Sequence, residues 1–215
     1  MAASPTHEPT HEPDRPLSPA ESLNLMEEQG RRTRADLRPD PLGIFLPWGL
    51  AYLVAFGAVW LTVGPGVLPP LVTTVVVALA FVLALSTVVL TTRRTFRGVA
   101  GPSQRVRALY GWSWPLGFAV LGVANSQLVG YGVPGPVISL IWSGSALIVV
   151  GLLTIAGGLL WPGSGQYALG VWILVSAAAS VVVGYPANFL VLALAGGGGF
   201  IVLAIVSRRR MRRGA

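Results

Sequence analysis

The stretch PLVTTVVVALAFVLALSTVVLTTRR, residues 70–94, decides the fold. No ionisable side chain occurs in it before the two arginines at its end, Arg93 and Arg94. A helix needs about 20 apolar residues to cross the hydrocarbon core of a bilayer. The stretch therefore predicts a transmembrane helix whose arginine end lies in the cytoplasm.

The rest of the chain repeats this pattern. Hydrophobic residues make up 53% of the sequence and charged residues 11%, which is about half the charged fraction of a typical soluble domain. Turns rich in glycine and proline separate the apolar stretches. The sequence predicts an all-α polytopic membrane protein with six transmembrane helices in three hairpins. The predicted spans are residues 42–63, 70–92, 108–130, 136–161, 167–184 and 187–207.

The segment before these spans differs in composition, because it holds all eight acidic side chains. Residues 1–17 contain a proline at every fourth position of a short repeat and are predicted to be disordered. A helix is predicted over residues 18–38, because Ser18 can cap it and Glu21 stands where a capping box places its acid.

The predicted helix 18–38 is either cytoplasmic or interfacial. Leu23 and Met26 lie one turn apart and give it a thin apolar stripe. Such a helix can lie on the membrane surface or pack on a cytoplasmic protein, and the stripe is too narrow to choose between the two.

Arginine sets the predicted topology. Clusters precede the first span, connect the second and third spans, and follow the sixth, while the alternating connections at 64–69, 131–135 and 185–186 carry no charge. Six spans with both termini in the cytoplasm place every cluster inside, and residues 208–215 become a basic cytoplasmic tail. The arginines of the last two clusters are Arg93, Arg94, Arg97, Arg105, Arg107, Arg208, Arg209, Arg210, Arg212 and Arg213.

The net charge of +7 does not predict a nucleic-acid partner. Arginine at the cytoplasmic ends of apolar segments is an ordinary orientation signal, and its expected ligands are anionic lipid headgroups. The sequence leaves open a cytoplasmic protein partner at residues 18–38 and self-association into a homo-oligomer.

The predicted spans contain none of the ionisable side chains that usually catalyse reactions or bind metals. Residues 41–92 and 108–207 have no Asp, Glu, His, Lys, Arg or Cys. Proton-coupled carriers and hydrolases need such groups, as do zinc and iron sites. The sequence therefore predicts no enzyme, no catalytic residues, no metal and no cofactor. His7 and His11 in the tail are a poor metal site.

Neutral polarity remains at the predicted outer ends of the spans. Asn125, Ser126 and Gln127 in the third span fall at the same level as Asn188 in the sixth. These four residues are a candidate outer-leaflet polar patch for a small ligand. The alternative is that their amides cap helix ends and bond between helices.

The sixth predicted span contains four consecutive glycines, Gly196, Gly197, Gly198 and Gly199. Glycine permits close approach of two helix backbones in a membrane. It can equally mark a helix broken at mid-depth, as in several transporter sites. The run is therefore a candidate packing surface or hinge.

Glu21-Ser22-Leu23, followed by Asp40-Pro41 and Trp48-Gly49-Leu50-Ala51-Tyr52-Leu53, resembles the opening of a group of small actinobacterial membrane proteins. These have six predicted spans and are sometimes labelled transporters or permeases. The resemblance covers the N-terminal helix and first span most clearly and brings no catalytic residues. It implies a bacterial plasma-membrane location, with which the arginine-rich, lysine-free composition agrees.

The predicted function is a non-enzymatic membrane-embedded subunit or sensor that acts through partner contacts. The alternative is a transport component, either a permease subunit or a facilitator for a neutral or lipidic solute.

Overall fold

Helices make up almost all of the structure, a computed structural model that describes residues 18–36, 40–95, 102–161 and 164–213. The chain divides into two units, residues 1–38 and residues 39–215, which are described separately. The first contains helix α1 and the second contains all the apolar helices.

Helix α1 spans Pro19–Asp36. Its first turn forms the capping box that the sequence predicts: the Ser18 backbone N–H donates to Glu21 Oε2 at 2.8 Å, and the Glu21 N–H donates to Ser18 Oγ at 3.2 Å. The hydrogen bonds from Ser18, that of its backbone first, hold the pKa of Glu21 below its ordinary value. The predicted tail, residues 1–17, lies outside the described residues.

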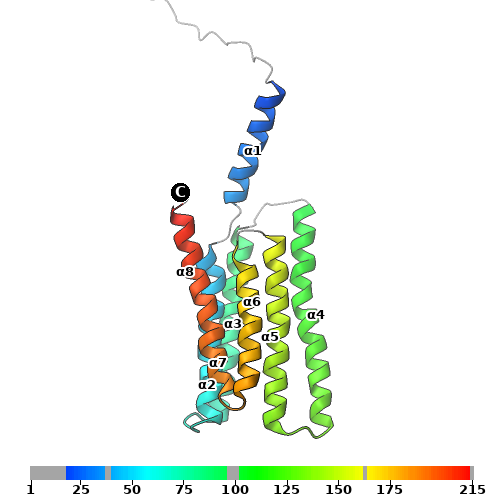
Figure 1. Cartoon of the computed structure of the whole chain (residues 1–215), viewed down its shortest axis with the longest axis vertical. Coiled ribbons are helices and arrows are strands. Elements are labelled where there is room, and N and C mark those ends of the chain that lie inside the picture. The colour runs from blue at the N-terminus through cyan, green and yellow to red at the C-terminus, as the bar shows by residue number, and fades with distance from the viewer. Residues whose placement is uncertain (1–17, 37–39, 96–101, 162–163, 214–215) are drawn as a thin grey trace, which may run out of the picture. The chain divides into compact units, whose positions relative to one another are not determined.

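The second unit, called the membrane unit below, is a set of antiparallel helices joined by turns (Figure 1). Its first helix starts where Asp40 accepts the Leu42 N–H at 3.2 Å and Pro41 occupies the first turn. The elements are α2 Pro41–Val63, α3 Pro70–Thr95, α4 Pro102–Gly130, α5 Gly135–Leu160, α6 Gln166–Val183, α7 Asn188–Val191, the π-helical segment η1 Leu192–Gly197, and α8 Gly198–Arg213.

Five stretches of the described chain are long and apolar enough to cross a membrane: α2, α3, α5, α6 and the continuous helix Asn188–Arg213. This is the make-up of a multi-span membrane protein, as the sequence predicts. The remaining predicted span, the third (residues 108–130), lies in α4, which has 29 residues but is less apolar, since polar side chains stand in its first and last turns. The number six stays a prediction.

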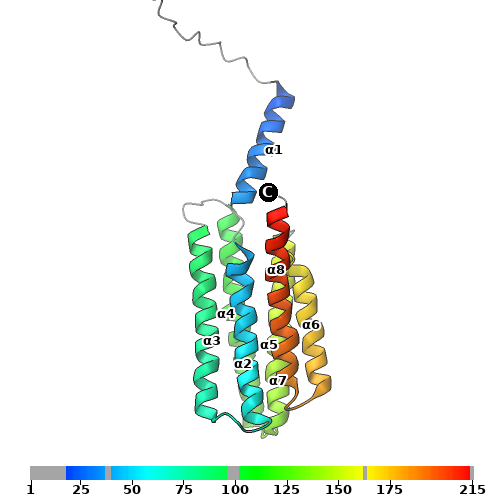
Figure 2. The same ribbon diagram turned by 90° about the vertical axis from the view of Figure 1, so that its left-hand side faces the viewer.

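The helices of the membrane unit pack in the order α3, α2, η1–α8, α6, α5, α4. Figures 1 and 2 show this row bent back on itself, so that α3, α2 and α8 form one layer and α4, α5 and α6 form the other. The three predicted hairpins are present as neighbouring pairs. The structure adds two contacts between hairpins, α5 with α6 and α2 with η1–α8, which together make the centre of the unit.

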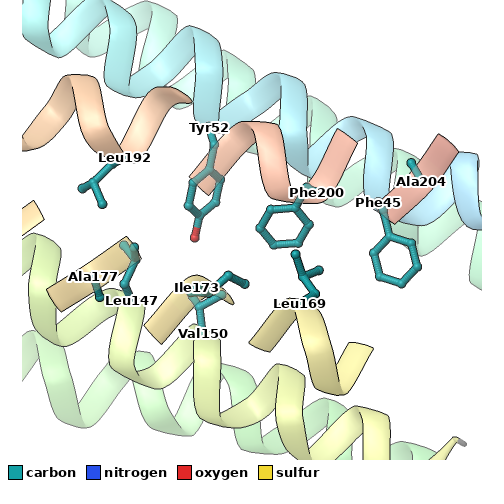
Figure 3. Packing of buried hydrophobic residues seen from close by; sticks show 10 residues of the cluster. All are labelled: Phe45, Tyr52, Leu147, Val150, Leu169, Ile173, Ala177, Leu192, Phe200 and Ala204. Carbon is teal, nitrogen blue, oxygen red and sulfur yellow. The ribbon is translucent and has the colours of Figure 1, made fainter. Parts of the chain in front are cut away.

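Apolar side chains fill the space between the two layers (Figure 3). Leu147, Ile173 and Leu192 have their side chains fully buried. Phe81 of α3 and Trp114 of α4 pack against this cluster from the edge helices. The core cluster consists of Phe45, Tyr52, Leu147, Val150, Leu169, Ile173, Ala177, Leu192, Phe200 and Ala204.

Candidate functional site

The backbones of α2 and η1 touch at a pair of facing glycines. A Cβ built on Gly197 would lie 2.9 Å from the Gly49 carbonyl oxygen, and a Cβ built on Gly49 would lie 2.9 Å from the Gly197 carbonyl oxygen. Only glycine permits so close an approach of two helices. We call this contact the glycine crossing.

The other glycines of the run have different surroundings. A Cβ on Gly196 would stand 3.2 Å from the Tyr52 ring, and one on Gly199 would overlap the Trp172 indole. A Cβ on Gly198 would meet nothing within 4 Å. The helix is continuous from Asn188 to Arg213, so three of the four glycines serve as contact points and the chain does not unwind at them.

The glycine crossing coincides with the π-helical segment η1, Leu192–Gly197. In a π turn each backbone N–H bonds to the carbonyl five residues earlier, one residue further back than in an α-helix. The pairing of backbone N–H groups with carbonyls therefore differs from that of an α-helix. The Trp172 indole N–H of α6 donates to the Ala195 carbonyl at 2.8 Å. The sequence alone does not indicate this hydrogen bond, because it depends on how α6 packs against η1.

Tyr52 lies beside the glycine crossing and faces the opposite layer. Its ring contacts Phe56, Phe81 and Phe200 at centroid distances of 5.2, 6.0 and 5.4 Å. Its hydroxyl points into the space between the layers (Figure 3). Tyr52 is not among the candidate site residues predicted from sequence, although a tyrosine inside an apolar span is a signal that could have identified it.

The four residues of the predicted polar patch do not come together. Asn125 donates from Nδ2 to Ser145 Oγ at 3.0 Å, and Asn188 donates from Nδ2 to Ser143 Oγ at 3.3 Å. Both serines belong to α5, but at about 100° per residue two positions apart point to opposite sides of the helix. The remaining patch residues, Ser126 and Gln127, are exposed.

The two asparagines therefore tie helices together, as the alternative interpretation expects. Asn125 joins α4 to α5, and Asn188 joins the last span to α5. The Asn188 side chain is fully buried, and its Oδ1 has no hydrogen-bond partner among the described residues. The Asn188 side chain therefore links the two layers through its Nδ2 while its Oδ1 acceptor stays unsatisfied by the described residues.

The arginines gather at one end of the membrane unit. Arg93 and Arg94 end α3, Arg105 and Arg107 lie in the first turns of α4, and the last arginines end α8. These three helix ends lie at the same end of the membrane unit in Figure 1. The uncharged connections 64–69, 131–135 and 185–186 lie at the opposite end. Arg97 lies outside the described residues. The charge separation predicted from sequence is thus present in the fold.

Within the residues that the structure describes, no three His, Cys, Asp or Glu side chains approach one another closely enough to hold an ion. His7 and His11 lie outside the described residues.

No family model, curated protein or solved structure matches the chain. The resemblance to small actinobacterial membrane proteins stays a prediction.

Proposed function

We propose that the protein is a non-enzymatic six-span membrane subunit of a bacterial plasma membrane, with both termini in the cytoplasm and with α1 as its docking element for a cytoplasmic protein. The observation that carries the docking role is the exposure of apolar side chains on α1. Leu23 is 60% exposed, Leu25 42% and Met26 68%.

The charge of α1 favours a protein over the membrane surface as its partner. Helices that lie on anionic membranes are rich in lysine and arginine on the polar face. Pro19–Asp36 carries four carboxylates and three arginines, so its net charge is slightly negative. The helix therefore lacks the excess of basic side chains that attracts interfacial helices to anionic headgroups, and the exposed leucines and Met26 are available to a protein groove.

Six spans are supported by the arrangement of α4 as well as by charge. This helix packs along α5, its start lies at the arginine end of the unit, and its last residues lie at the uncharged end (Figure 1). A 29-residue α-helix is about 43 Å long at 1.5 Å per residue, which exceeds the hydrocarbon thickness.

The absence of cysteine from the chain makes the topology directly testable. Single cysteines at Val67, Gln104, Tyr131 and Met211 should each be the only thiol in the protein. We expect a membrane-impermeant maleimide to label positions 67 and 131 in intact cells, and positions 104 and 211 only after permeabilisation. Labelling of 104 and 131 from the same side would show that α4 does not cross.

The docking role of α1 is tested by site-specific photo-crosslinking in cells. A photoreactive amino acid at Met26 should give an adduct with a protein of one discrete mass, whereas the same group at the exposed Asn24 serves as the control. Replacement Leu23→Glu should remove the adduct. Crosslinks to lipid, or protein adducts that survive Leu23→Glu, would contradict the docking proposal while leaving the topology unaffected.

A transport component is the second candidate, and η1 is the observation that favours it. π-helical turns inside α-helices occur frequently at functional sites, and in this one Gly196 lies against the ring of the buried Tyr52. The test compares uptake and export of neutral and lipidic dyes in cells that express the wild type, Asn125→Leu or Gly197→Ala. Equal dye fluxes in all three and in cells without the protein would rule it out.

A further inference from the structure

A hollow lies between the start of α2 and the end of α8. Its volume is about 240 Å³, and Leu42 of α2 lines it together with four residues of α8, namely Ile205, Arg208, Arg209 and Arg212. The three arginines follow Ile205 by three, four and seven positions, so all four side chains share one face of α8. Two aliphatic side chains thus stand beside three guanidinium groups.

Within the described part of the membrane unit, no carboxylate balances the charge in this hollow. Asp40 is the only acidic side chain after residue 39, and its carboxylate accepts the Leu42 N–H as the cap of α2. Among the described residues, no carboxylate forms an ion pair with Arg208, Arg209 or Arg212. A bound anion would therefore meet a positive field from the described residues of the membrane unit. The C-terminal end of α8 holds these cations favourably, since its free carbonyls carry partial negative charge.

The order of the lining residues matches the order of groups in a membrane lipid. Ile205 is the last of the lining residues inside the apolar part of the helix, and the arginines begin at Arg208. Guanidinium groups bind phosphate through paired hydrogen bonds, and basic pockets on the cytoplasmic side of membrane helices bind anionic headgroups. The volume is below that of typical pockets for a whole small molecule, about 300–1,000 Å³, so it suits a headgroup whose acyl chains run outside.

We propose that this hollow binds the headgroup phosphate of an anionic phospholipid, with Arg208, Arg209 and Arg212 on the phosphate and with Leu42 and Ile205 against the first methylene groups. The lipid would join the first and last spans at their cytoplasmic ends. The proposal rests on the membrane orientation proposed above and is independent of the docking role of α1.

The test uses the purified full-length protein and native mass spectrometry with added lipid. Arg208→Gln/Arg212→Gln removes two lining charges, and Arg210→Gln/Arg213→Gln removes the same charge from the same helix end outside the hollow. Hydrogen bonds to charged groups contribute about 1.5–3 kcal/mol each, so the lining pair should bind phosphatidylglycerol at least about tenfold more weakly than the wild type. The control pair should stay within about twofold.

Three outcomes would overturn the proposal. Equal loss in both pairs would show general attraction by a basic tail. Equal binding of phosphatidylcholine and phosphatidylglycerol would show no role for net lipid charge. Displacement of phosphatidylglycerol by inorganic phosphate at equal concentration would identify a soluble anion as the ligand. None of these outcomes bears on the cysteine-labelling or crosslinking results, so failure here is distinguishable from failure of the proposed function.

Discussion

Two helix contacts in the membrane unit are built on facing glycines, and only one of them contains a π-helix. In the glycine crossing of α2 with η1, each glycine Cβ would lie 2.9 Å from the carbonyl oxygen of the other, Gly49 or Gly197. In the contact of α5 with α6, a Cβ on Gly151 would lie 3.2 Å from the Gly170 oxygen, and a Cβ on Gly170 would lie 2.7 Å from the Gly151 oxygen. Close backbone approach therefore needs glycine but does not need a π turn.

The difference lies in what the two contacts connect. Helices α5 and α6 follow each other in the chain, whereas α2 and η1 belong to the first and last apolar stretches. At the glycine crossing a third helix also takes part, since Trp172 of α6 donates to Ala195 of η1. The contact between distant segments is a joint of three helices, and the local one is a contact of two.

The largest expected effect comes from blocking either contact with a leucine. Gly49→Leu and Gly170→Leu each place side-chain atoms onto a facing backbone, which should destabilise the fold by about 3 kcal/mol or more. Thermal unfolding of the detergent-solubilised protein measures this loss. Gly122→Leu, at a glycine with nothing within 4 Å of its Cβ, is the control. Damage from Gly170→Leu alone would mean that the glycine crossing does not hold the fold together.

A smaller effect separates two neighbouring glycines of η1 and α8. The Cβ of Gly197→Ala meets the Gly49 oxygen and the Leu53 side chain at 2.9 Å, so we expect a loss of about 1–2 kcal/mol. Gly198→Ala meets open space and should gain up to about 1 kcal/mol, because alanine favours the helix. Unfolding midpoints of the two variants should move in opposite directions. A shared direction would show that helix propensity, and not contact, decides both.

The hydrogen bond from Trp172 of α6 to η1 is expected to contribute less to stability than either glycine contact. Trp172→Phe keeps an aromatic ring but removes the donor to the Ala195 carbonyl, and we expect a loss of about 1 kcal/mol. Hydrogen exchange should rise in η1 and stay unchanged in α5 and the facing part of α6. Trp142→Phe is the matched control, because among the described residues Trp142 is hydrogen-bonded through its backbone carbonyl, which accepts from Ser145, and its indole N–H donates to no other residue. Unchanged exchange in η1 would show that the hydrogen bond does not hold the π turn.

The smallest effect lies outside both contacts, in α1. Neither contact contains a titratable group, so acid should leave both intact. The pKa of Glu21 is lowered in the helix, so its stabilising effect is present above the ordinary value of 4.5 and is lost as the pH falls through the lowered pKa. Amide exchange at the start of α1 should rise over that range. Ser18→Ala removes the side-chain contribution and keeps the backbone N–H, so it should return the Glu21 pKa part of the way toward its ordinary value, and an unshifted titration would contradict a role for the Ser18 side chain.

The sequence is sufficient to predict the helices and the charged end of the unit, because both are local properties. A run of apolar residues and the arginines beside it can be read without knowing what the helix touches. The two glycine contacts are of another kind. Gly49 and Gly151 look like any other glycine in a span, and which of them faces a partner depends on how all the helices pack together.

The candidate site shows the same limit. Asn125 and Asn188 were identified as polar groups, but their serine partners on α5 are 20 and 45 residues away in the chain. Hydrogen bonding between helices was the general expectation, and the sequence contained nothing to choose Ser145 for one and Ser143 for the other. The α4 helix is the reverse case: it contains the whole predicted span 108–130 and begins six residues earlier, and its weaker apolar character leaves its crossing of the membrane to experiment.

The π turn also sets how the last span tolerates changes in its length. Its buried residues Asn188, Leu192, Gly196, Phe200 and Ala204 recur at every fourth position. Four turns of an ordinary α-helix take about 14 residues, fewer than this stripe uses, and the wider π turn absorbs part of the excess. Loss of one residue near Gly198 can therefore close η1 into an α-helix and leave the angular position of Phe200, Ala204 and the arginines nearly unchanged. An insertion of one residue cannot be absorbed in this way and would rotate Phe200, Ala204 and the arginines away from α2. The last span should therefore tolerate the loss of one residue better than the gain of one.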